Sequence, residues 1–245
     1  IIDQDITQLI VNHSINDSWD MTLSHSRKDR LYDRTGVYES EEYDKLIEVK
    51  GNPSTMASFY EMECYRRLED LENLSELAAK FEPENLLYKF QKKQYEMYGV
   101  FWDAVRTKSW NRLNAICRDE KWRGAKLPGN LRGQISYCHG LALEGAGQPV
   151  KALNAYNNAF VADFAASEEI TRKSALNCLR IILDHEDVKT AMDLYSTEDY
   201  SDESNGAALI KEATGLLKLW DKVLGSGESV PSKYKTFLKY PPKNR

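Results

Sequence analysis

The stretch GQISYCHGLALEGAGQPVKALNAYNNAFVADFAA, residues 133–166, decides the fold class of this chain. It holds two runs in which apolar residues recur every three or four positions, the spacing that places side chains on one face of an α-helix. Gly147 and Pro149 separate the two runs, and proline is tolerated in the first turn of a helix. The stretch therefore predicts two amphipathic helices joined by a short turn.

The same pattern recurs every 39 residues on both sides of this stretch. One apolar column of the repeat contains Leu74, Leu113, Ala152 and Ala191. The column that precedes each second helix contains Asp70, Ser109, Gln148 and Asp187, and three of these four are good N-cap residues. The pattern predicts four helix pairs, at 54–68 with 71–81, 85–106 with 110–120, 130–145 with 149–162, and 167–184 with 188–195.

The expected fold class is all-α, with a strand content near zero. It is a right-handed α-α superhelix, or solenoid, of about four helix-turn-helix repeats over residues 54–225. The helix expected at 206–224 is amphipathic and would cap the open end of the last repeat. Residues 1–53 are expected to form an N-terminal segment with a short apolar helix around Ile6, Leu9 and Ile10, an irregular polar stretch at 25–35 and a helix at 40–49.

The third pair resembles a tetratricopeptide repeat. Its small and aromatic residues match the family pattern at Gly140, Gly147, Ala152, Tyr156 and Ala159. The fourth pair keeps only Ala191 and Tyr195, the first two pairs keep the apolar skeleton alone, and the period is 39 residues rather than the family's 34. Other solenoids of helical pairs, including those that flank large kinases and those of the Sel1 type, are alternatives.

The resemblance implies a concave groove lined by the first helix of each pair. The candidate partner-binding residues at the implied groove positions are Phe59, Glu63, Arg66, Tyr98, Trp102, Gln134, Tyr137, Leu141, Lys173 and Arg180. Tyr, Trp and Arg contribute most of the binding energy in many protein interfaces, and an apolar-aromatic groove suits an extended peptide or a partner helix. The alternative is that long helices bury several of these side chains between neighbouring units.

No motif in the sequence indicates catalysis, so we expect neither a catalytic nor a metal site, and no cofactor. The histidines are scattered, and the acidic stretch at 198–203 lacks the glycine and the closing glutamate of a calcium loop. His139 stands beside Cys138, but adjacent residues of a helix point in different directions. Four single cysteines, Cys64, Cys117, Cys138 and Cys178, fit a core of reduced thiols in a cytosol-like compartment.

Net charge and composition limit the kinds of partner that the chain could bind. The net charge of −5 argues weakly against general nucleic-acid binding, and no apolar run is long enough to insert into a membrane. Residues 226–245 form a basic aromatic tail with Lys233, Tyr234, Lys235, Phe237, Lys239, Tyr240, Lys243 and Arg245. This tail either packs its aromatic rings on the last helix or, together with Trp122, Arg123 and Lys126, binds RNA by charge and stacking.

The sequence therefore predicts a non-enzymatic scaffold or adaptor domain that binds a protein or peptide segment. A ligand- or peptide-sensing regulatory domain and an RNA-binding repeat module are the alternatives. The chain begins at Ile1 without a methionine, so we expect it to be a domain or subunit of a larger assembly. The expected compartment is the cytoplasm, with the nucleus as the alternative.

Overall fold

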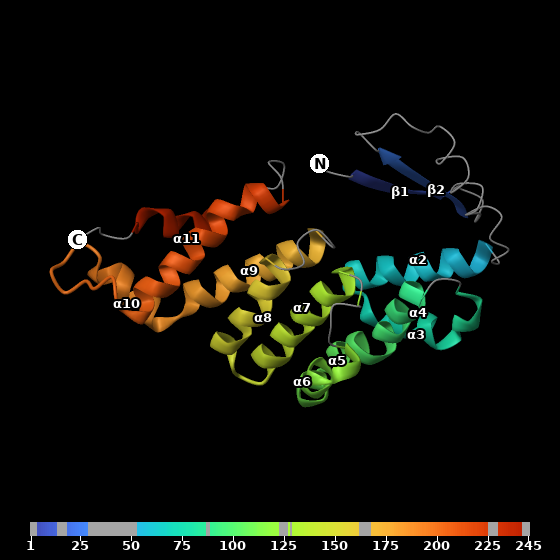
Figure 1. Cartoon of the computed structure of the whole chain (residues 1–245), viewed down its shortest axis with the longest axis horizontal. Coiled ribbons are helices and arrows are strands. Elements are labelled where there is room, and N and C mark those ends of the chain that lie inside the picture. The colour runs from blue at the N-terminus through green and yellow to red at the C-terminus, as the bar shows by residue number, and fades with distance from the viewer. Residues whose placement is uncertain are drawn as a thin grey trace.

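The computed structural model describes residues 4–13, 19–28, 53–86, 89–122, 127, 129–161, 168–224 and 230–241. From residue 53 onward, every regular element in these residues is helical, which confirms the all-α class for this part of the chain. The helices follow one another from α2 at one end of an elongated body to α10 at the other, and α11 returns along α9 (Figure 1).

From residue 53 onward the expected helices are present, and their ends differ from the predicted ones by a few residues. The α-helices are α2 (Pro53–Arg67), α3 (Leu71–Lys80), α4 (Lys89–Met97), α5 (Asp103–Arg106), α6 (Trp110–Arg118), α7 (Gly129–Gly145), α8 (Pro149–Val161), α9 (Glu168–Asp184), α10 (Glu186–Leu194) and α11 (Asn205–Leu224). Short 3-10 turns are η1 (Pro83–Asn85), η3 (Glu120–Trp122) and η4 (Ser232–Lys239). The helix expected at 40–49 lies outside the described residues.

A π-helical turn, η2 (Tyr98–Trp102), joins α4 and α5 into one continuous helix. Within it the backbone N–H of Asp103 donates to the carbonyl of Tyr98, five residues earlier. Such turns are rare and occur frequently at functional sites. Here the wider turn carries two of the expected groove residues, Tyr98 and Trp102.

The N-terminal segment differs from the expectation. Strands β1 (Gln4–His13) and β2 (Trp19–Lys28) form an antiparallel hairpin in which His13 is opposite Trp19. The predicted short helix and the near-zero strand content are therefore wrong. In β2, Trp19, Met21 and Leu23 alternate with polar residues, which is the period of a strand, and β1 is rich in β-branched residues that favour strands.

The turns inside the first three helix pairs share one backbone geometry. Glu69, Lys108 and Gly147 stand 39 residues apart and have positive φ angles of 61°, 52° and 74°. The next N–H in each turn donates back to a carbonyl five residues earlier, from Asp70 to Tyr65, Ser109 to Ala104 and Gln148 to Leu143, each at 2.9 Å. This is the Schellman arrangement, which satisfies the free carbonyls of a helix C-terminus.

Helix caps confirm the sequence prediction at one position and correct it at another. Asp70 caps α3, since its carboxylate accepts a hydrogen bond from the backbone N–H of Asn73 at 3.3 Å. Asp187 was expected to cap the last helix of the fourth pair, but α10 begins one residue before it. The cap is His185, whose Nδ1 accepts from the N–H of Asp187 at 3.2 Å.

Candidate functional site

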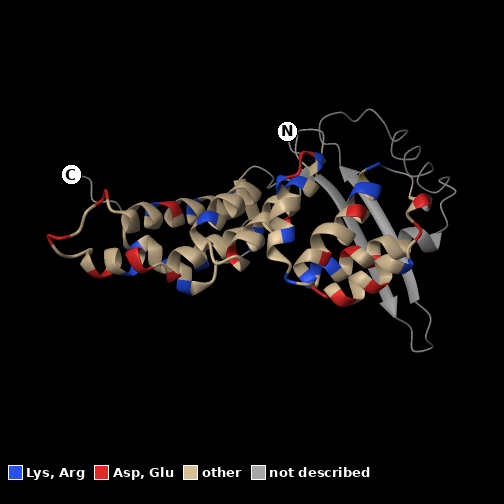
Figure 2. Cartoon of the chain, turned by 90° about the horizontal axis from the view of Figure 1, so that it is seen from below, with Lys and Arg blue, Asp and Glu red and all other residues tan. Residues whose placement is uncertain are grey.

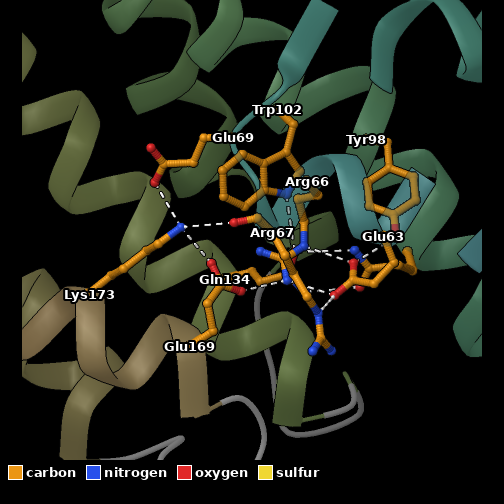
Figure 3. Close-up of polar contacts among 10 residues, drawn as sticks. Glu63, Arg66, Arg67, Glu69, Tyr98, Trp102, Gln134, Glu169 and Lys173 are labelled. Carbon is orange, nitrogen blue, oxygen red and sulfur yellow. Dashed lines mark hydrogen bonds and ion pairs between the residues drawn. The ribbon is translucent and has the colours of Figure 1, made fainter. Parts of the chain in front are cut away.

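The expected groove residues come from α2, η2, α7 and α9, and most of them meet where these helices come together (Figure 3). We call the following set the inner cluster: Glu63, Arg66, Gln94, Tyr98, Trp102, Gln134, Glu169 and Lys173. Phe59 joins the cluster through a ring contact with Tyr98, with the ring centroids 6.3 Å apart. The structure thus brings several of the predicted residues together and adds Gln94 and Glu169, which the sequence pattern did not indicate.

Arg66 is at the centre of the inner cluster. Its Nη2 lies 2.6 Å from Glu63 and 2.8 Å from Glu169, although Glu169 is 103 residues away in the sequence. The guanidinium also lies over the ring of Trp102, 5.3 Å from its centroid. Only 1% of the Arg66 side chain is exposed, so a full positive charge is buried between two carboxylates and an aromatic face.

The pKa of Glu63 depends on two opposing effects, its burial and the positive charges beside it. Burial acts to raise the pKa, because desolvation penalises the carboxylate. The hydrogen bonds and charges of Arg66 and Arg67 act in the opposite direction, and the net result is a pKa below its usual value of 4.5. Glu63 is therefore ionised at neutral pH.

Amides and hydroxyls supply further hydrogen bonds within the inner cluster. The indole N–H of Trp102 donates to Gln134 Oε1 at 3.1 Å, and the amides of Gln94 and Gln134 donate to each other at 3.0 and 3.2 Å. The Tyr98 hydroxyl donates to Glu63 at 2.9 Å. Buried polar groups that are paired in this way hold their side chains in one arrangement.

Lys173 and Arg180 extend the contacts along α9. Lys173 Nζ is 2.7 Å from both Glu169 and Glu69. Arg180 pairs with Glu144 at 2.6 Å, and Glu144 also accepts a hydrogen bond from the Tyr156 hydroxyl. Tyr156 in turn contacts the ring of Tyr137, which contacts the ring of Trp102. Leu141, the remaining candidate, is partly buried against the hydrophobic core.

Most of the candidate groove side chains are covered. Arg66, Tyr98, Trp102 and Gln134 are between 1% and 4% exposed. The helices cross so closely that side chains expected to face a partner pack on one another instead. On this side a partner could reach them only if the covering groups moved, and substituting them would change the stability of the fold as well as any binding.

An open cleft of about 310 Å³ lies beside the inner cluster, between α3 and the continuous helix of α4, η2 and α5. Its walls are mostly apolar, small or aromatic: Leu71, Leu74, Ser75, Ala78, Ala79, Tyr95, Glu96, Tyr98, Gly99, Trp102 and Asp103. Two of the candidate groove residues, Tyr98 and Trp102, therefore border an accessible space on one side.

The sequence pattern did not indicate the α3 side of this cleft, because the groove was expected on the first helix of each pair and Leu74 was placed in an apolar column of the repeat. The signal was present in Ser75, Ala78 and Ala79, which put small side chains on one face of α3 opposite Gly99. The two acidic groups at the rim are already paired, Glu96 with Lys93 and Lys121, and Asp103 with Arg106 and Arg112. The part of the cleft lining that is not engaged in ion pairs is therefore mostly apolar rather than charged.

Burial raises the pKa of the thiols of the three buried cysteines, Cys117, Cys138 and Cys178. Cys138 is completely buried, which raises the pKa of its thiol well above the usual value, and burial raises the pKa of Cys117 to about 12. All four cysteines are free thiols, and Cys64 is the partly exposed one. Within the described residues, no group of three or more His, Cys, Asp or Glu side chains could hold a metal ion.

The basic aromatic tail is docked over residues 230–241. Tyr234 and Phe237 of η4 are buried, and η4 packs on α9 and α11. The Tyr195 hydroxyl donates to the carbonyl of Pro241 at 2.7 Å. The tail thus packs its rings on the body, and the buried rings cannot stack on RNA bases. Trp122 is also buried, under Lys93, whereas Arg123, Lys126, Lys243 and Arg245 lie outside the described residues.

Figure 2 shows that acidic and basic residues are interspersed along the helices, with acidic residues in the loop that joins α10 to α11. That loop carries Glu198, Asp199, Asp202 and Glu203. No helix in the described residues has the length and apolarity needed to cross a membrane.

A comparison with known proteins finds no matching family model, no matching curated protein and no matching solved structure.

Proposed function

We propose that residues 54–225 form a tetratricopeptide-like solenoid of four helix pairs capped by α11, and that it works as a scaffold that binds a segment of a partner protein. The observation that carries the proposal is the recurring left-handed turn at Glu69, Lys108 and Gly147. An identical backbone geometry at a fixed spacing is what a repeat unit produces, and it appears in units that share little more than apolar residues.

Contacts between neighbouring units support the same repeat. Tyr98 contacts Glu63, and Tyr137 contacts Trp102, so both pairs join residues 35 positions apart. Shifting the first pair by one repeat of 39 residues gives the second pair. The fourth unit departs from the pattern at its turn, since α9 and α10 are separated by His185 alone.

The accessible surface for a partner is the cleft between α3 and η2. Its volume of about 310 Å³ reaches the lower limit of typical ligand pockets, which begin near ~300 Å³. Apolar walls with aromatic edges and small residues suit one or two apolar side chains of a bound segment better than a charged group. Because the rim acids are already paired, the surrounding charges are held in place before binding.

Filling the cleft should abolish partner binding without disturbing the fold. Gly99 lines the cleft and is exposed, and a Cβ built on it meets nothing within 4 Å, so Gly99→Gln adds a side chain at the wall of the cleft without a clash at its Cβ. Gly215 in α11 is the matched control, because it is also a helical glycine with no neighbour within 4 Å. The measurement is affinity capture from a cell extract with the wild type and both variants, after circular dichroism has shown equal helix content.

The proposal expects at least one protein that the wild type and Gly215→Gln retain and that Gly99→Gln loses. Its binding to the purified variants would then be measured directly, with an expected loss of tenfold or more, the equivalent of about 1.4 kcal/mol. Equal retention of every captured protein by all three chains would contradict the cleft as the docking surface.

A further inference from the structure

The cleft between α3 and η2 is bounded at both of its ends. At one end the Tyr95 hydroxyl donates to the carbonyl of Ala78 at 2.9 Å, and both residues line the cleft. At the other end Arg106 of α5 pairs with Glu72 of α3 at 3.1 Å. Between these two contacts α3 rises by about 9 Å, at about 1.5 Å per residue. The cleft is therefore a short hollow, rather than a groove that a strand or a helix could follow along its length.

The volume of the cleft fits one large aromatic side chain. An apolar cavity of about 150 Å³ takes up one benzene ring. The cleft has a volume of about 310 Å³, roughly twice as much, which is room for two fused rings. A leucine side chain or a single ring would leave part of this space unfilled, and the lining would lose van der Waals contacts there.

The two walls of the cleft suit a flat ring. On the α3 side, Ala78 and Ala79 present small side chains. On the opposite side the lining includes Tyr98 and Trp102, and Gly99 between them adds no side chain. Aromatic rings attract one another in offset-stacked and edge-to-face arrangements. Small residues that face aromatic ones thus leave space for an incoming ring and give it aromatic neighbours.

The charges in the cleft lining favour a hydrogen-bond donor over an acid. Among the described residues, the lining includes the carboxylates of Glu96 and Asp103 and neither a lysine nor an arginine. Arg106 donates to Asp103 at 2.8 Å, which lowers the pKa of Asp103 and keeps it ionised at neutral pH. An indole N–H and the positive edge of an aromatic ring complement carboxylates, whereas an acidic group would be repelled by them.

We infer that the cleft receives one tryptophan side chain of the partner segment, with the indole N–H directed towards the carboxylates of Glu96 and Asp103. The inference rests on the proposed function, which makes the cleft the docking surface, and it adds the chemistry of the group that fills it. Tryptophan is prominent among the residues that contribute most of the binding energy in protein interfaces. A single anchoring ring, with the rest of the segment outside the hollow, also agrees with the two bounded ends.

The test is a selection from a library of random peptides displayed on phage. The wild-type chain selects the binders, and counter-selection with Gly99→Gln removes the peptides that bind outside the cleft. Gly215→Gln is the control, because it changes another open helical glycine and leaves the cleft as it is. Counter-selection with this variant should therefore remove the cleft binders as well. The surviving peptides are sequenced, and one is synthesised in two forms, with its tryptophan and with leucine in place of it.

Peptides that survive counter-selection with Gly99→Gln should share a tryptophan at one position. The leucine form should bind the wild-type chain about tenfold more weakly or worse, because it underfills the cleft and lacks the donor. Leucine, phenylalanine or an acidic residue at the shared position would overturn the inference, and so would equal binding of the two synthetic peptides.

A selection without any cleft-dependent peptide would also overturn the tryptophan site. The capture experiment can still succeed in that case, because it asks only whether a protein of any composition depends on the cleft. A protein that Gly99→Gln loses, together with a failed peptide selection, would remove the tryptophan and keep the docking surface.

Discussion

Replacing Arg66 by methionine is expected to lower the free energy of unfolding by about 3–5 kcal/mol. Arg66 is buried between Glu63 and Glu169, and its removal takes away the buried cation that they share and leaves them only the more exposed Arg67 and Lys173. Methionine fills much of the space but supplies no hydrogen bond to either acid. The measurement is urea-induced unfolding, followed by the helical signal, for the wild type and the variant.

Arg67→Met is the matched control for this prediction. Arg67 is the next residue in the same helix and also pairs with Glu63, at 2.9 Å, but its side chain is 60% exposed. Exposed ion pairs contribute little because water and salt screen them, so the expected loss is below about 1 kcal/mol. Equal losses of unfolding free energy for the two variants would show that the buried ion pairs of Arg66 stabilise the fold no more than the exposed ion pair of Arg67.

Gly140→Ala is expected to destabilise the chain by about 2–3 kcal/mol, although alanine normally favours a helix. A Cβ at this position would lie 2.3 Å from Cε1 of Tyr156. The Tyr156 ring is fully buried, contacts Tyr137 and donates its hydroxyl to Glu144, so it has no room to retreat. Thermal or urea unfolding measures the loss.

Gly215→Ala provides the opposite sign in the same experiment. Gly215 lies inside α11, and its added Cβ would meet nothing within 4 Å. The substitution should raise the free energy of unfolding by about 0.5–1 kcal/mol, because alanine loses less backbone entropy in a helix. A stabilising effect at Gly140 would mean that α7 and α8 do not approach each other as closely as described.

The helices could be predicted from the sequence because apolar spacing is a local property. Residues 133–166 show the helical spacing of apolar residues clearly. Aligning the sequence at intervals of 39 residues reveals the same spacing in segments that have no specific motif. The hairpin was missed because Ile6, Leu9 and Ile10 also fit the spacing of a helix face, and a short apolar run does not distinguish the two. The strand pattern was clearer in the partner, where Trp19, Met21 and Leu23 alternate.

The candidate site was predicted in its position but not in its accessibility. A repeat pattern tells which side chains share a face, and Tyr98, Trp102 and Gln134 do share one. It does not tell which side chains cover that face, which depends on contacts such as that between Arg66 and Glu169 across 103 residues. The cleft beside α3 is also lined by the π-helical turn, which no local pattern predicts.

Substitutions in the left-handed turn test most directly whether the chain repeats one structural unit every 39 residues. A non-glycine residue with positive φ is strained, so Lys108→Gly should raise the free energy of unfolding by about 0.5–1 kcal/mol, and Gly147→Ala should lower it by about 1 kcal/mol. Lys151→Gly, at an exposed position inside α8, should lower it by about 0.5–1 kcal/mol.

These opposite signs at Lys108 and Lys151 are the result that the repeat predicts, since only the first lies in the recurring turn. If urea unfolding showed that glycine destabilises both positions alike, or that alanine is tolerated at Gly147, the three turns would not share one geometry. That result would contradict the repeat and, with it, the solenoid on which the proposed function rests.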